Sequence, residues 1–101
     1  MTKPINGALA LVLFIAFGPA AAKGGQEVYN TTCAACHATG VASAPRYGSE
    51  ADWAPRLKRG RDALAASVIK GKGAMPPKGG DPKLSDSDVK NAVDHMLNAV
   101  R

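Results

Sequence analysis

The sequence predicts an all-α protein of about four short helices. No segment alternates apolar and polar residues with the period of two that a half-buried strand requires. Residues 85–100 instead repeat apolar side chains every three to four positions, as an amphipathic helix does. Upstream of them, glycines and prolines divide the chain into pieces that suit only short helices and loops. With 101 residues and a net charge of +5, the chain has room for one domain.

The first 22 residues have the features of a signal peptide. Lys3 gives a positive start, residues 8–17 form an apolar run, and Ala20–Ala22 supply the small residues of a cleavage site. We expect cleavage after the last of these alanines, which leaves a periplasmic domain, residues 23–101, with a net charge of about +4 because only Lys3 is lost. The run has about 10 residues where a membrane span needs about 20. Membrane association is therefore expected only if the leader is retained.

Two helices and a loop are predicted in the first half of the domain. Residues 24–35 form the first helix, which ends in a cysteine motif. The small residues, glycines and proline of 38–48 indicate an irregular loop. A short helix is expected over residues 51–59.

The second half contains a well-delimited helix, a stiff loop and the clearest helix of the chain. Asp62 is expected to cap a helix over 63–70, which Gly71 stops. Glycines and prolines exclude a continuous helix or strand from 71–82. In the last helix Ser85 and the acidic residue three positions later form a capping box. The apolar stripe of this helix consists of Val89, Ala92, Val93, Met96, Leu97 and Val100.

The motif Cys33-Ala34-Ala35-Cys36-His37 carries the chemistry. In the pattern C-x-x-C-H, two thiols about one helical turn apart can add to the two vinyl groups of one haem. The histidine is then held against the iron as its proximal ligand. A covalent haem also answers the shortage of apolar core in so small a domain, because it becomes permanent apolar filling. We therefore predict one haem c with iron, attached through Cys33 and Cys36 and ligated by His37.

Three other uses of this cysteine pair fit the sequence less well. A thioredoxin-like redox pair belongs in a βαβ context, which is absent here. A zinc site needs four ligands, and beyond the motif only the distant His95 could contribute. A disulfide between Cys33 and Cys36 would close too small a loop to stabilise the fold much.

The sixth ligand of the iron is expected to be Met75. Met96 belongs to the apolar stripe of the last helix, where a methionine ordinarily fills the core. His95 lies beside that stripe, and its ligation would turn Met96 outward. Met75 instead lies in a loop whose glycines permit close backbone approach and whose paired prolines stiffen it. A loop stiffened around one polarizable side chain indicates a target for that side chain.

With these motifs in view, the chain resembles class I c-type cytochromes, most closely the cytochrome c5 group. The resemblance covers residues 24–101. The segments that carry it are Cys33-Ala34-Ala35-Cys36-His37-Ala38-Thr39-Gly40, Trp53-Ala54-Pro55-Arg56, Ala74-Met75-Pro76-Pro77-Lys78-Gly79-Gly80 and Leu84-Ser85-Asp86. Some members of the group have a second cysteine pair, which this chain lacks, so no further disulfide is expected.

The resemblance implies a small cytochrome c fold wrapped around one covalently attached haem. The terminal helices would cross where Gly25 and Tyr29 meet the stripe that contains Val93 and Leu97. It further implies that the Pro45 carbonyl accepts the second ring proton of His37. The residues expected to line or cover the haem edge and its propionates are Tyr47, Trp53 and Arg56; for Trp53, simple packing in the core is an equal alternative.

A histidine and a methionine on the iron leave no site for substrate, so the predicted function is one-electron transfer in a periplasmic respiratory chain, and the protein is not an enzyme. If Met75 does not bind iron, the alternative is a five-coordinate ligand-binding or peroxidase-like haem protein; a bound haem subunit of a larger oxidoreductase is a third possibility. The expected partners are redox proteins such as a terminal oxidase or dehydrogenase, and no nucleic acid. A basic rim could steer acidic partners; it would comprise Arg56, Lys58, Arg59, Arg61, Lys70, Lys72 and Lys78.

Overall fold

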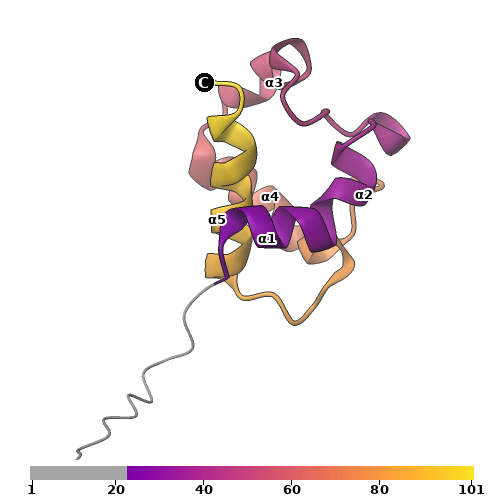
Figure 1. The fold of residues 1–101 in the computed structure, drawn as a ribbon, viewed down its shortest axis with the longest axis vertical. Helices are drawn as coiled ribbons and strands as arrows, with labels where there is room; N and C mark the ends of the chain where they lie inside the picture. Colours follow the sequence, from indigo (N-terminus) through magenta and orange to yellow (C-terminus); the bar gives the residue numbers. More distant parts are fainter. Residues whose placement is uncertain (1–22) are drawn as a thin grey trace, which may run out of the picture.

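The computed structural model describes residues 23–101, and the predicted signal peptide lies outside this range. Helices joined by loops make up the described chain (Figure 1). Its β-type pairing is a single isolated bridge between Lys72 and Met75. The prediction of an all-α fold is confirmed.

The first helical run holds the cysteine motif in its last turns. It consists of α1 (Gly25–Val28), a π-helical turn η1 (Tyr29–Cys33) and α2 (Ala34–His37). The helix predicted to end at residue 35 thus continues through His37. A π-helical turn holds more residues than an α-helical turn, so it changes the face on which the following side chains emerge. The motif in α2 is presented by this turn, which an apolar pattern cannot reveal.

The last helix, α5 (Asp86–Asn98), begins with the predicted capping box. Ser85 Oγ accepts a hydrogen bond of 3.0 Å from the Asp88 backbone N–H, and Asp88 Oδ2 accepts one of 3.0 Å from the Ser85 N–H. Two backbone donors at the helix start are thereby satisfied. The same Asp88 carboxylate accepts a 2.8 Å hydrogen bond from the backbone N–H of Lys23, which fastens the start of the described chain to α5.

The helix α1 crosses α5, as the resemblance implied (Figure 1). Gly25 lies at the crossing, where a β-carbon would collide with the carbonyl oxygen of Asn91. Only glycine allows two helix backbones to approach this closely. The Asn91 side chain also donates a 3.0 Å hydrogen bond to the Lys23 carbonyl, beside the same crossing.

Two helices lie between these terminal elements. The helix α3 (Glu50–Leu57) begins at Ser49, whose hydroxyl accepts from the Asp52 N–H. The helix α4 (Arg61–Lys70) stops at Gly71, as predicted, with a positive φ of 90°. Its start differs from the prediction: Gly60 is the N-cap, and Asp62 lies inside the first turn, paired with Arg61 at 3.0 Å. Gly60 has a φ of 85°, which lets the chain turn into the helix before Asp62 is reached.

Both predicted loops contain a short 3₁₀ turn. These turns are η2 (Val41–Ser43) and η3 (Pro77–Gly80). Each contains residues other than glycine in the left-handed region, namely Ala42 and Ser43 in the first and Lys78 in the second.

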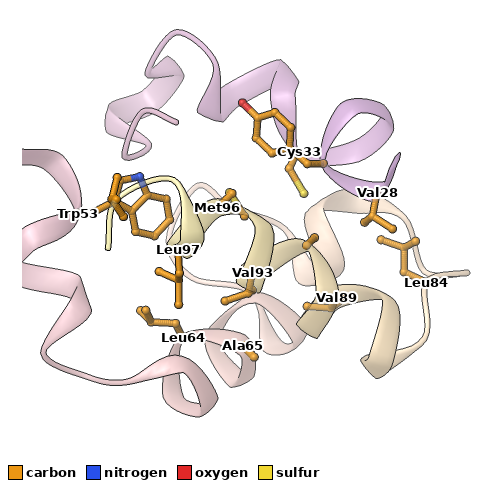
Figure 2. Packing of buried hydrophobic residues seen from close by; sticks show 13 residues of the cluster. Val28, Cys33, Trp53, Leu64, Ala65, Leu84, Val89, Val93, Met96 and Leu97 are labelled. Carbon is orange, nitrogen blue, oxygen red and sulfur yellow. The ribbon is translucent and has the colours of Figure 1, made fainter. Parts of the chain in front are cut away.

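One apolar core joins the four helical segments (Figure 2). Val28, Val89 and Leu97 are its largest completely buried side chains. Met96 is buried, as expected for a core methionine, and so is Trp53. Within residues 23–101 we find no helix with the length and apolar character needed to span a bilayer.

Candidate functional site

An apolar cavity of about 410 Å³ lies inside the ring of helices and loops. Its volume is within the range of about 300 to 1,000 Å³ typical of ligand sites. Every helical segment of the fold contributes to its wall. Among its lining residues are Cys33, Cys36, His37, Pro45, Trp53, Arg56, Leu64, Val68, Met75, Val93 and Met96. The folding of the chain therefore gathers most of the predicted haem-site residues around one apolar space.

His37 is buried in this wall and its ring is held by one backbone group. Nδ1 lies 2.8 Å from the carbonyl oxygen of Pro45. A carbonyl only accepts, so this contact assigns the ring proton to Nδ1 and leaves the lone pair on Nε2. Within the described residues Nε2 makes no hydrogen bond to protein. A buried imidazole whose free nitrogen carries a lone pair is suited to bind a metal ion in the cavity.

The two cysteines differ in burial although both line the cavity. Cys33 is buried, and Figure 2 shows its sulfur directed towards α5; Cys36 is exposed. Burial raises the pKa of the Cys33 thiol to about 11. Its sulfur is therefore neutral at physiological pH, which suits an apolar wall. Both sulfurs are free thiols in the described chain, so both are available to form thioethers.

Of the three side chains considered for the sixth position, two line the cavity. Met75 is half-buried, and its backbone N–H and carbonyl are both hydrogen-bonded to Lys72, at 3.0 and 2.9 Å. Met96 is buried in α5 and also lines the cavity. His95 is not part of the lining. Its ring lies 5.5 Å from that of Tyr29 and 5.2 Å from that of Tyr47, in an aromatic cluster of three rings.

The residues expected at the haem edge separate into two groups. Trp53 both packs in the core and lines the cavity, with its ring centre 6.0 Å from that of His37. Arg56 also lines the cavity, and its Nη1 donates a 2.7 Å hydrogen bond to the Asp52 carbonyl. Tyr47 differs: it is absent from the lining, is 39% exposed and stacks in the aromatic cluster with His95.

Several cavity residues had no such role in the sequence analysis. The loop residues Val41, Ala42 and Ser43 line one side of the cavity, and no local pattern indicates this. Leu64 and Val68 line another side from α4; their helical spacing identified an apolar face but not what that face contacts. Arg59 and Lys72 were expected only as rim cations, and they also belong to the lining.

The cavity and its histidine fit a haem c bound through the two thiols of the motif. An α-helical domain that encloses one such group is a monohaem c-type cytochrome.

Comparison with known proteins agrees with this class. Residues 20–96 match the family model described as cytochrome c oxidase, cbb3-type, subunit III. Cytochrome c-555 of Chlorobaculum tepidum is 46% identical over 96% of this chain and 93% of its own length. Cytochrome c5 of Azotobacter vinelandii is 42% identical over 74% of this chain and 93% of its own.

Solved structures give the same result. The cytochrome c in an electron transfer complex with nitrite reductase has a TM-score of 0.73 and 48% identity, covering 76% of this chain and 94% of that one. A mono-heme ferrocytochrome c from Shewanella putrefaciens has a TM-score of 0.67 and 43% identity, covering 76% and 95%. The chain belongs to the cytochrome c family. It is a small electron-transfer protein with one covalent haem c, and not an enzyme.

Proposed function

We propose that this cytochrome carries single electrons between periplasmic redox proteins on an iron ligated by His37 and Met75. The observation that supports this most is the pairing of a buried histidine, fixed at Nδ1 by Pro45, with an apolar cavity that Met75 also lines. Haem c bound there supplies reversible one-electron chemistry at its iron. An apolar surround and a methionine ligand both raise the reduction potential.

In this proposal Cys33 and Cys36 hold the haem by thioether bonds, and His37 Nε2 binds the iron. The Pro45 carbonyl keeps the ring proton on Nδ1, so the lone pair faces the cavity whenever the loop is in place. Trp53 closes the apolar wall near His37. Tyr47 has no part in the proposed haem site, since it lies outside the lining.

Arg56 and Arg59 are proposed to face the haem propionates. Both line the cavity, and neither forms an ion pair within the described residues. Arg56 is held by the Asp52 carbonyl at 2.7 Å and Arg59 by the Ser67 hydroxyl at 2.8 Å. Guanidinium groups at an apolar wall are suited to carboxylates that arrive with the cofactor.

The test is the visible spectrum of the holoprotein and of two methionine variants. The unsubstituted protein should be low-spin, show the weak long-wavelength ferric band of a thioether ligand and fail to bind carbon monoxide when reduced. Met75→Leu should lose the band, bind carbon monoxide and have a lower potential. Met96→Leu, a change of similar volume on the opposite side of the ligand question, should keep all three properties. The reverse pattern would exchange the roles of the two methionines.

The partners proposed for this cytochrome are redox enzymes such as a terminal oxidase, a dehydrogenase or a nitrite reductase; the last is the partner of a cytochrome 48% identical to this chain. The cations Arg56, Arg59 and Lys72 line the same cavity and suit an acidic partner face. The rate of electron transfer to such an enzyme should fall with ionic strength, and Lys72→Glu should reduce both the rate and its salt dependence. A rate independent of salt would argue against a charged docking face.

Export with cleavage after Ala22 remains part of the proposal. It would leave Lys23 as the first residue, and its backbone nitrogen is the donor to Asp88 at 2.8 Å. Cleavage there would replace a neutral N–H donor with an ammonium group against a carboxylate, which is a stronger hydrogen bond. Mass measurement of the periplasmic protein should give a chain of residues 23–101 plus one haem.

A further inference from the structure

The loop that carries Met75 is joined to α5 through Lys78. Lys78 Nζ donates a hydrogen bond of 2.7 Å to the carbonyl oxygen of Leu84 and lies 3.6 Å from Asp86 Oδ1. Leu84 is buried, and Asp86 is the first residue of α5. The lysine thus connects a loop at the cavity to the start of the longest helix.

Within the described part of the chain, this is the only side-chain hydrogen bond made by residues 71–80. The other hydrogen bonds of the loop join its own backbone: Lys72 pairs with Met75, and the Gly79 N–H donates to the Pro76 carbonyl. Such bonds shape the loop but leave it free to move as a unit. Only apolar contacts and Lys78 oppose that movement, the closest contact being that of Gly79 with Thr32.

Lys78 also has an unfavourable backbone conformation. Its φ of 55° is in the left-handed region, where a side chain carries a steric cost, although the next residue is a glycine that would accept this conformation freely. The side chain is mostly buried, with 24% of its surface exposed. A strained position occupied by a residue with a buried ammonium contact indicates that the contact offsets the strain.

We propose that Lys78 is a positioning residue for the iron ligand Met75, and that its bond to the Leu84 carbonyl keeps the loop closed on the haem. This inference rests on the proposed ligation by Met75. Loss of the bond should increase the fraction of molecules in which the loop is open and the thioether is off the iron. An added ligand binds only those molecules, so its apparent affinity reports that fraction.

Imidazole is the probe, titrated into the ferric holoprotein while the long-wavelength band is followed. In Lys78→Met, which keeps the length of the side chain and removes the ammonium, the apparent Kd for imidazole should fall about tenfold, as expected for one lost hydrogen bond from a charged donor. Lys78→Arg should retain most of the unsubstituted value. Lys83→Met removes the same charge from an exposed neighbour that makes no side-chain hydrogen bond, and it should change the Kd less than about twofold.

Lys78→Gly separates the anchor from the backbone strain. Glycine relieves the positive φ, so a loop limited by strain would close more firmly and imidazole would bind more weakly. Our proposal predicts the opposite, tighter imidazole binding than in the unsubstituted protein. A purely structural role would lower the midpoint of global unfolding in urea and leave the imidazole affinity unchanged.

The outcomes distinguish this inference from the proposal it rests on. If the unsubstituted protein lacks the long-wavelength band and binds imidazole as tightly as Met75→Leu, ligation by Met75 and the role of Lys78 both fail. If the band is present and Lys78→Met binds imidazole within about twofold of the unsubstituted protein, the ligation stands and the role of Lys78 is overturned.

Discussion

The indole Nε1 of Trp53 donates a 2.9 Å hydrogen bond to the carbonyl oxygen of Arg46, the residue after the proline whose carbonyl holds His37. Two consecutive carbonyls of one loop are therefore fixed, one by the core tryptophan and one by the histidine of the cysteine motif. The Tyr47 N–H closes the same loop by donating to the His37 carbonyl at 2.7 Å.

Trp53→Phe should destabilise the holoprotein by about 1–2 kcal/mol, because it removes one hydrogen bond from a largely apolar site and keeps an aromatic ring. Trp53→Ala should cost about 3–5 kcal/mol, because it also empties the space behind His37. Urea unfolding followed by circular dichroism measures both. Equal losses in the two variants would show that packing does not distinguish them, contrary to this account.

Gly25→Ala should destabilise the protein by about 2–4 kcal/mol, since its β-carbon would collide with the Asn91 carbonyl and force α1 away from α5. Gly24→Ala is the matched control. A β-carbon at Gly24 meets nothing within 4 Å, and the φ of −63° at this position suits alanine. Thermal unfolding of the two holoproteins should therefore show a large decrease in Tm for the first and almost none for the second.

Ser85→Ala should cost about 1 kcal/mol by removing half of the capping box at the start of α5. Ser87→Ala is an exposed change in the first turn of the same helix and should alter the free energy of unfolding by less than about 0.5 kcal/mol. Urea unfolding of the two variants at pH 7 makes the comparison. A loss of similar size in both would remove the cap as its cause.

The Arg46–Asp52 pair predicts a pH dependence. The Arg46 side chain, with Nε 2.8 Å from Asp52 Oδ2, and its backbone N–H hold the pKa of this carboxyl at about 2, below its unfolded value of about 4. A depressed carboxyl pKa stabilises the fold above the unfolded value, and this stabilisation is lost as pH falls from about 4 through about 2. Asp52→Asn should therefore be less stable than the unsubstituted protein at pH 7.

The difference between these two proteins should shrink as the pH approaches 2. Urea midpoints measured at pH 7, 4 and 2.5 provide the test, and comparison between the two proteins cancels the contribution of other carboxyls such as Asp88. A difference that does not change with pH would mean that the ion pair is not the source of the stabilisation.

Local features of the sequence were sufficient for most of the helices. The capping box at Ser85 and the stop at Gly71 each depend on residues a few positions apart, so the sequence displays them directly. The same locality made the start of α4 the error: Asp62 is a good capping residue by type, but the positive φ available to Gly60 moved the helix start upstream. The π-helical turn before Ala34 has no local signature at all.

The sequence by itself determined the cysteine motif, the helical class and the stiff loop around Met75, because each is written in residue type and short-range spacing. Only the tertiary structure decided which side chains share the cavity. It brought Pro45, Trp53 and Arg56 to the wall with His37 and assigned Tyr47 to a cluster with Tyr29 and His95. It also joined Lys78 to Leu84 across the end of a loop. These contacts depend on the directions in which packed helices hold their loops, and those directions are fixed by burial of the whole core rather than by any one segment.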